Sequence, residues 1–222
     1  MPRTDAVLFD LDGTLALHDQ DGDALLERTF DRVGVDRFAD QLALREATNA
    51  APDAEDSVSF MANAFKIAAE RADADPVPAT DLAATYVGMI DHSAVHFRDG
   101  AREALESVGD RPIGLVTNGE RAHQRQKLES LGIEGTFDAI VYGGDTVPAK
   151  PATEPFDVVL DEIGVAPGDA VHVGNSLADD VAGANRAGVT SVWVPTDADR
   201  EESATAEPMH TLDSLETLPT IL

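Results

Sequence analysis

The sequence predicts an α/β protein with a doubly wound parallel sheet and an inserted α-helical region. Short apolar runs alternate with helix-like stretches near the start and through the last half of the chain. Between them, roughly eighty residues have helical periodicity and no convincing strand. Strands that alternate with helices pair in parallel, and ligands of such sheets bind beyond the carboxyl ends of the strands.

The core elements follow from these runs. We expect strands at residues 6–10, 112–117, 139–142, 170–173 and 190–194, and helices at 101–108, 120–131, 155–163 and 177–187. The core is expected to comprise residues 1–14 and 98–222, with residues 15–97 as the helical insert. Two helices of the insert each have one apolar face, formed by Leu25, Leu26, Phe30 and Val33 and by Phe60, Ala64, Ile67 and Ala68. Weaker helical patterns cover 36–49 and 80–90.

The charge balance is extreme. The chain has 42 acidic and 16 basic residues, a formal net charge of −26, and its acidic residues include a tract at 197–207 that we expect to be a solvated loop. Such a surface repels nucleic acid and anionic membranes, so we expect neither as a partner. We interpret it as typical of a halophilic protein, because the Debye length falls to roughly 3 Å at about 1 M salt.

Other protein classes are also excluded by composition. The chain has no cysteine, and therefore no disulfide, thiolate zinc site or cysteine nucleophile. No apolar run approaches the ~20 residues of a membrane helix, and residues 1–5 lead directly into a strand-like run without an apolar leader. We therefore expect a cytoplasmic protein.

Two carboxylates stand where the first apolar run ends, in the segment Phe9-Asp10-Leu11-Asp12-Gly13-Thr14. Asp10 and Asp12 are two residues apart, so both can face the same crevice, and Gly13 permits a sharp turn. An Asp-Gly turn beside an incidental acid is the alternative interpretation of this segment alone.

Three further segments follow the expected strands or lie in a loop at the same sheet edge. Thr117-Asn118-Gly119 precedes a helix, where a hydroxyl and free backbone N–H groups can hold phosphate oxygens. Lys150 is notable because the chain has only three lysines, and its ammonium could meet both Asp10 and a phosphate. Segment 174–180 offers Asn175, Asp179 and Asp180 as oxygen ligands for a hard cation.

In this order, the four segments resemble the four motifs of the haloacid-dehalogenase superfamily, whose members have a Rossmann-like core and in many cases a helical cap after the first motif. The resemblance implies that Asp10 is a nucleophile that forms an aspartyl-phosphate and that Asp12 is its acid/base partner. It implies that Thr117, Asn118, Gly119 and Lys150 bind the phosphate. The implied cofactor is Mg²⁺, held by Asp10, the backbone carbonyl of Asp12 and the fourth motif, and the implied partner is a small phosphorylated metabolite.

One position departs from the family pattern. Phosphatases of this superfamily usually have Asp where this chain has Asn175, and an amide oxygen can bind Mg²⁺ only without the charge. Asp179 or Asp180 could compensate as a ligand or through a bound water. A phosphotransferase such as a phosphomutase, a 2-haloacid dehalogenase and a catalytically impaired phosphate-binding protein remain alternatives, although Asp12 argues against the dehalogenase.

The excess of acidic residues predicts that the stability of the protein depends on salt. Because the acidic surface repels itself in dilute buffer, the midpoint of thermal unfolding should rise as KCl is increased toward molar concentrations. A melting series at fixed pH and increasing KCl measures this, with NaCl as a control for ion identity. A midpoint that is highest in dilute buffer would contradict the halophilic interpretation.

Overall fold

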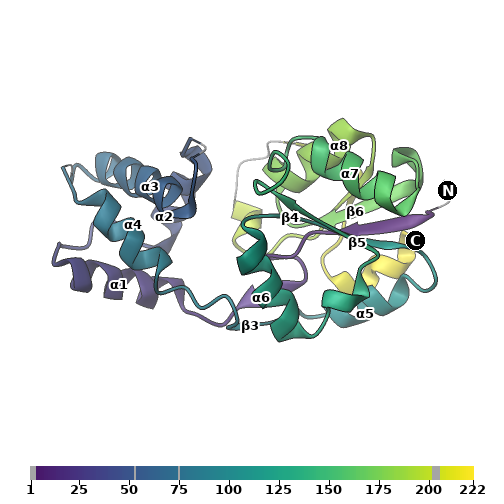
Figure 1. Cartoon of the computed structure of the whole chain (residues 1–222), viewed down its shortest axis with the longest axis horizontal. Helices are drawn as coiled ribbons and strands as arrows, with labels where there is room; N and C mark the ends of the chain where they lie inside the picture. Colours follow the sequence, from purple (N-terminus) through teal and green to yellow (C-terminus); the bar gives the residue numbers. More distant parts are fainter. Residues whose placement is uncertain (1–3, 53, 75, 202–205) are drawn as a thin grey trace. The chain divides into compact units, whose positions relative to one another are not determined.

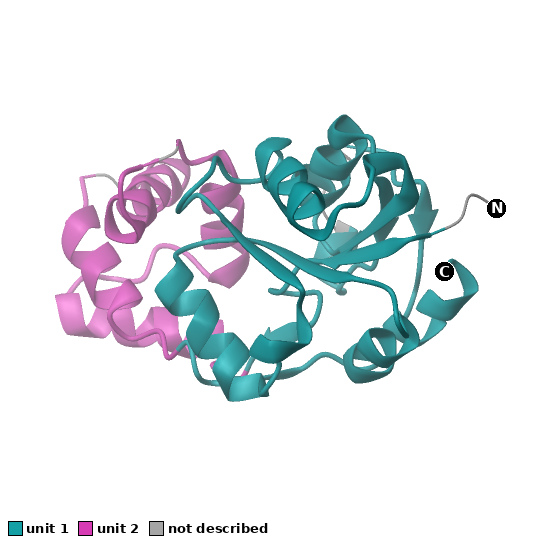
Figure 2. Ribbon diagram, turned by 45° about the vertical axis from the view of Figure 1, so that its right-hand side comes forward, with its two compact units in different colours: residues 1–18, 92–222 teal, residues 19–91 magenta. Residues whose placement is uncertain are grey.

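The computed structural model describes residues 4–52, 54–74, 76–201 and 206–222. The chain divides into two compact units, one formed by the segments up to His18 and from His92 onward, and the other by Asp19–Asp91 (Figure 2). The first unit contains the sheet, and the second contains helices. The predicted boundaries at 15 and 97 differ from this division, because β2 (Ala16–His18) and β3 (Val95–Phe97) belong to the first unit.

The first unit is built on a six-stranded parallel sheet in the order β5-β4-β1-β6-β7-β8 (Figure 1). Its strands are β1 (Ala6–Phe9), β4 (Ile113–Asn118), β5 (Ala139–Gly143), β6 (Ala170–Gly174), β7 (Thr190–Trp193) and β8 (His210–Thr211). The chain leaves β1 toward β4 on one side and returns to β6 on the other. The carboxyl end of β1 is therefore a topological switch point, which is where ligands of such sheets bind.

Helices cover both faces of this sheet, as the alternation of side chains along β1 requires. Val7 and Phe9 belong to the apolar core beneath α5 (Ala101–Ser107), α6 (Arg121–Leu131) and the 3₁₀ helix η5 (Leu215–Thr220). Ala6 and Leu8 belong to the core beneath α7 (Glu154–Ile163) and α8 (Ala182–Ala187). Because all four residues of β1 are buried, the strand is a continuous apolar run.

The doubly wound α/β fold is thus confirmed, and the structure adds elements that the sequence pattern missed. Strands β2 and β3 form a small antiparallel pair, and β8 adds an edge strand of two residues to the sheet. All three are too short to show a two-residue periodicity. Further short 3₁₀ helices lie at Glu134–Thr136 (η1), Pro167–Asp169 (η2) and Asp199–Glu201 (η4).

The acidic tract at 197–207 is not only a solvated loop. Asp199 begins η4 and is buried, which corrects that expectation for this residue. The prediction for 202–205 lies outside the described residues. A single buried acid within an acidic segment leaves no signature in the composition of the segment.

The second unit contains α1 (Gly22–Val33), α2 (Gln41–Ala50), α3 (Ser57–Arg71) and α4 (Ala79–Val87). The first three helices begin after an aspartate whose side chain accepts a hydrogen bond from the backbone N–H three residues later. These N-caps are Asp21, Asp40 and Asp56, with distances of 3.0, 2.8 and 2.8 Å. The expected helix at 36–49 therefore starts later than predicted, at the residue after Asp40.

Aromatic side chains form the centre of the second unit. The ring of Phe65 packs edge-on against Phe30 and Tyr86, with centroid distances of 6.3 and 6.0 Å. Of the predicted apolar face of α3, Ala64 and Ala68 are buried and Ile67 packs against the core, whereas Phe60 is only partly buried. Phe65, which was not predicted, is fully buried in its place. In a helix with apolar residues on several sides, periodicity alone does not select the inward face.

Across the residues that the structure describes, no helix is both long enough and apolar enough to cross a membrane.

Replacing Phe65 with Ala should lower the free energy of unfolding by about 3–5 kcal/mol, because a large buried ring leaves a cavity. Phe60→Ala is the matched control in the same helix and should cost much less. Urea unfolding followed by far-ultraviolet circular dichroism in molar KCl measures both. An equal or larger loss in Phe60→Ala would mean that Phe60 lies on the inward face of α3, as predicted.

Candidate active site

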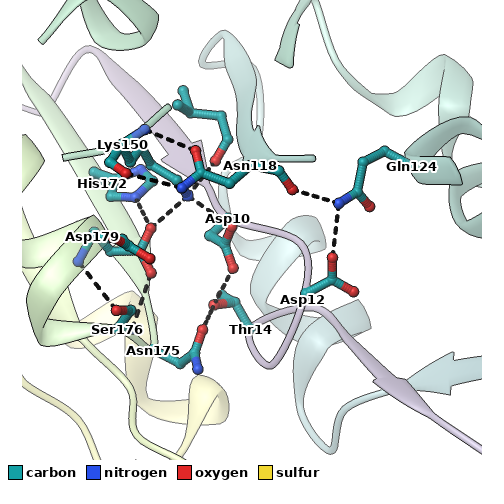
Figure 3. Close-up of polar contacts among 12 residues, drawn as sticks. Asp10, Asp12, Thr14, Asn118, Gln124, Lys150, His172, Asn175, Ser176 and Asp179 are labelled. Carbon is teal, nitrogen blue, oxygen red and sulfur yellow. Dashed lines mark hydrogen bonds and ion pairs between the residues drawn. The ribbon is translucent and has the colours of Figure 1, made fainter. Parts of the chain in front are cut away.

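Asp10 directly follows the central strand and is buried with its cationic partner. Lys150 Nζ donates hydrogen bonds to Asp10 Oδ1 at 2.7 Å, to Asp180 Oδ1 at 2.6 Å and to the carbonyl oxygen of Val116 at 2.7 Å (Figure 3). An ammonium group has three hydrogens, so each hydrogen of Lys150 Nζ makes one of these three hydrogen bonds. Although residues 10 and 150 are far apart in the sequence, they form one buried ion pair.

These contacts set the charges of the three groups. Burial would lower the pKa of Lys150, but the charges of Asp10 and Asp180 outweigh it and raise that pKa, so the ammonium is retained. Burial would raise the pKa of Asp180, but Lys150 and a hydrogen bond from His172 lower it overall. Burial raises the pKa of Asp10 above its usual range, with Lys150 opposing and Asp180 adding to the rise.

Asn118 positions the loop that carries Lys150. Its Oδ1 accepts a hydrogen bond from the backbone N–H of Lys150 at 2.8 Å, and its Nδ2 donates to the carbonyl oxygen of Lys150 at 3.0 Å. The side chain of Asn118, which was predicted to bind substrate, is thus engaged with both backbone groups of Lys150. Gly119 follows with φ +121°, where a Cβ would lie 2.9 Å from Gln124 Nε2.

Thr117, at the carboxyl end of β4, has a buried hydroxyl whose Oγ1 has no hydrogen-bond partner among the described residues. Buried polar atoms in proteins are nearly always paired, so an unpaired hydroxyl at a strand end marks a place for a ligand atom. The role of Thr117 toward a phosphate oxygen stays a prediction.

Asp12 is held by side chains that the sequence analysis did not select. Lys127 Nζ lies 2.7 Å from both carboxylate oxygens, and Gln124 Nε2 donates to Oδ2 at 2.9 Å. His18 Nε2 lies 3.5 Å from Oδ1. Desolvation would raise the pKa of Asp12, but the hydrogen bond from His18 and the charge of Lys127 lower it overall. Asp12 is therefore ionised, with about a third of its side chain exposed.

A signal for Lys127 and Gln124 was present in the sequence. The two residues are three apart in α6, so they share one face of the helix. The chain has only three lysines, and this rarity marks Lys127 as a candidate site residue just as it marks Lys150. Of the three lysines, two are buried at this site, and only Lys66 in α3 is exposed.

Asn175 follows β6 and faces Asp10 through Thr14. Thr14 Oγ1 lies 3.1 Å from Asp10 Oδ2 and 3.2 Å from Asn175 Oδ1. Gly13, with φ +79°, permits this approach, because a Cβ there would lie 2.6 Å from Asn175 Nδ2. The carboxylate oxygen of Asp10, the hydroxyl oxygen of Thr14 and the amide oxygen of Asn175 thus lie close together at the carboxyl ends of β1 and β6.

The oxygen donors of this cluster fit Mg²⁺, which prefers hard oxygen ligands and commonly uses only one or two protein carboxylates. Among the described residues no group of three or more His, Asp or Glu side chains forms a candidate metal site. A metal at this position would therefore depend on amide and backbone oxygens as well as on Asp10.

The remaining acids of the fourth motif have different surroundings. Asp180 is buried, and its oxygens contact Lys150, His172 Nε2 at 3.0 Å and the backbone N–H of Ser176 at 3.0 Å. Asp179 donates its backbone N–H to Ser176 Oγ at 3.1 Å within the π-helical turn η3 (Leu177–Val181). Asp180 thus orients Lys150, a contact that the predicted role as a metal ligand did not include.

His172 lies behind Asp180 and was not selected from the sequence. Burial lowers its pKa despite the opposing effect of Asp180, so the imidazole is neutral and its Nε2 carries the hydrogen donated to Asp180. Its ring packs edge-on against Phe156 with a centroid distance of 4.9 Å. A histidine within an apolar strand carries no sequence signal that separates this role from simple packing.

Replacing Lys150 with Met should lower the free energy of unfolding by about 3–5 kcal/mol, because Asp10 and Asp180 are then buried without their cation. Lys66→Met is the matched control, since Lys66 is exposed, and it should have little effect. Adding Asp180→Asn to Lys150→Met should recover part of the loss. Chemical denaturation in molar KCl measures all four proteins, and equal losses in the two lysine variants would contradict the buried ion-pair network.

Comparison with known proteins gives consistent results. A family model described as haloacid dehalogenase-like hydrolase matches residues 4–188. N-acylneuraminate-9-phosphatase of Rattus norvegicus is 38% identical over 109 residues, which cover 49% of this chain and only 44% of that protein. Validoxylamine A 7'-phosphate phosphatase of Streptomyces hygroscopicus subsp. limoneus is 29% identical over 202 residues, covering 90% of each chain.

Among solved structures, the putative HAD-hydrolase YfnB of Bacillus subtilis, bound to magnesium, is similar with a TM-score of 0.76. It is 21% identical and covers 99% of this chain and 98% of that one, which is a likeness of fold. The family match extends over most of the chain and includes all the segments that form the buried site. The protein therefore belongs to the family of haloacid dehalogenase-like hydrolases.

Proposed function

We propose that this protein is a Mg²⁺-dependent phosphatase that hydrolyses a small phosphate monoester through an aspartyl-phosphate at Asp10. The observation that carries the proposal is the arrangement at the end of β1. A buried Asp10 is paired with Lys150, and Thr117 offers an unpaired hydroxyl at the neighbouring strand end. The two curated relatives described above are both phosphatases by name.

In the first step, an oxygen of Asp10 attacks phosphorus and the bond between phosphorus and the leaving oxygen breaks. The leaving oxygen takes a proton from Asp12. In the second step, Asp12 takes a proton from water, the resulting hydroxide attacks phosphorus, and the bond to Asp10 breaks to release phosphate. Dividing the hydrolysis in this way replaces one difficult displacement with two easier ones.

The contacts of Asp12 suit the second step directly. Its pairing with Lys127 keeps the carboxylate ionised, which is the form that accepts a proton from water. Delivery of a proton in the first step requires Asp12 to be protonated and hence released from Lys127. About a third of the Asp12 side chain is exposed, so a leaving group has access to it.

Repulsion between Asp10 and an incoming phosphate has to be offset by nearby positive charge. Lys150 supplies one cation within hydrogen-bond distance of Asp10. Asp10, the backbone carbonyl of Asp12 and Asn175 would hold Mg²⁺, which when bound supplies the positive charge that stabilises the transferring phosphoryl group. The net charge of −26 makes such local cations necessary for binding an anionic substrate.

The helical unit Asp19–Asp91 is proposed to be a cap that selects the substrate, since it is inserted after the first motif, between the short strands β2 and β3. Its own aromatic core lets its surface vary without disturbing the sheet. The substrate class is a small phosphorylated metabolite.

Asp10→Asn should abolish hydrolysis of an aryl phosphate, because it keeps the shape of the side chain but removes the nucleophile. Asp12→Asn should reduce the rate by roughly 10²–10⁴-fold if proton transfer is its role. Released phosphate measured with and without Mg²⁺ in molar KCl tests both, with Asp161→Asn, an exposed residue of α7, as an acid-to-amide control. Activity of Asp10→Asn within a few-fold of wild type would refute the mechanism, and halide release from a 2-haloacid without phosphatase activity would favour the dehalogenase.

A further inference from the structure

The side-chain amide of Asn175 is hydrogen-bonded, on the side away from Thr14, to a buried aspartate that belongs to none of the four motifs. Asn175 Nδ2 donates to Asp199 Oδ2 at 2.9 Å. Asp199 lies in η4, beyond the end of β7, and only 2% of it is exposed. The backbone carbonyl of Asn175 is also fixed, since it accepts a hydrogen bond from Trp193 Nε1 at 2.7 Å. The amide side chain and the backbone of Asn175 are thus both tethered to the β7 side of the sheet.

This contact fixes which end of the amide faces Asp10. An ionised carboxylate can only accept hydrogen bonds, so the nitrogen of the amide has to face Asp199. The oxygen then faces the other way, and Asn175 Oδ1 does lie 3.2 Å from Thr14 Oγ1, which contacts Asp10. With the amide turned over, an oxygen would oppose the Asp199 carboxylate and the nitrogen would oppose a metal ion. Asp199 excludes that orientation.

We propose that Asp199 is a positioning residue that presents Asn175 Oδ1 as a neutral oxygen ligand to the cation at Asp10. The inference rests on the proposed function, because it assumes a metal at that place. The side chains at 175 and 199 then depend on each other, because the carboxylate at 199 needs a hydrogen-bond donor and the amide at 175 supplies it. Asn175 is then a ligand of the metal site, and its presence does not mean that the protein has lost catalytic activity.

The same geometry explains why aspartate does not suit position 175 in this chain. A carboxylate there would place an oxygen where the amide nitrogen now lies, 2.9 Å from Asp199 Oδ2. Two like charges buried at that distance repel each other strongly. The charge that the substitution Asn175→Asp would bring to the metal is therefore opposed by Asp199.

A structural role for Asp199 in its own loop is the competing explanation. Its Oδ2 also accepts hydrogen bonds from the backbone N–H and from Oγ1 of Thr196, both at 2.7 Å. If Asp199 served only to hold this turn, then weakening the turn would have the same effect as changing Asp199. Thr196→Val removes the hydroxyl contact and leaves the contact with Asn175, so it is the matched control.

The test is a double-mutant cycle with Asn175→Asp, Asp199→Asn and the two combined, together with Thr196→Val. The dissociation constant of Mg²⁺ alone is measured by calorimetry at fixed molar KCl, and the midpoint of thermal unfolding is measured without Mg²⁺. Neither measurement requires turnover. In the combined variant the amide at 199 carries no charge, so the carboxylate at 175 no longer faces a second carboxylate.

We expect the effect of Asp199→Asn to change sign with its partner. In the wild-type background it should weaken Mg²⁺ binding on the order of tenfold, because the amide of Asn175 is no longer oriented. In the Asn175→Asp background it should strengthen binding by a similar factor, because the repelling charge at 199 is removed. Without Mg²⁺, Asn175→Asp should lower the unfolding midpoint, and the second substitution should restore most of it.

Two results would overturn the inference while wild type still binds Mg²⁺. One is a change in the same direction in both backgrounds, or effects that add to within about threefold. The other is a loss of Mg²⁺ affinity in Thr196→Val equal to that in Asp199→Asn. A wild-type protein that binds no Mg²⁺ would instead overturn the proposed function, and the metal-positioning role of Asp199 with it.

Discussion

The ammonium group of Lys150 lies in the interior of the protein, with one hydrogen bond to Asp10, one to Asp180 and one to a backbone carbonyl of β4. A buried charge is tolerated only when it is paired and all its hydrogen bonds are made, so this group constrains everything around it. Asn118 fixes the backbone of the lysine on both sides. On the far side of Asp180, His172 and the backbone of Ser176 supply further donors. The strand ends of β1, β4 and β6 are thereby joined by one polar network.

A chain with a net charge of −26 would ordinarily repel a phosphate ester. Two of its three lysines are nevertheless buried within hydrogen-bond distance of the two acids of the first motif. The electrostatic field at the site is therefore set by nearby charged groups. Molar salt would screen these buried ion pairs less than it screens the exposed acids. An acidic surface and local cations at the site are compatible, because they involve different residues.

The loops beyond β7 contribute to the site as much as the motifs do. Arg98 donates to the carbonyl oxygens of Gly13, Val194 and Pro195, and so ties the turn after Asp12 to the segment that leads to Asp199. Asp199 in turn holds the amide of Asn175. A departure from the usual residue at 175 is thus matched by a partner about two dozen positions later.

The sequence by itself determined the doubly wound fold and the convergence of Asp10, Thr117, Lys150 and Asn175, since carboxyl ends of adjacent parallel strands meet at one edge. Only the tertiary structure decided the partners, such as Lys127 for Asp12, His172 for Asp180 and Asp199 for Asn175. It also decided that Phe65 rather than Phe60 faces the core of the helical unit. The reason is physical. Strands and helices follow periodic patterns set by neighbouring residues, whereas a hydrogen bond between side chains brought together by folding depends on the packing of whole elements and leaves no periodic trace in the sequence.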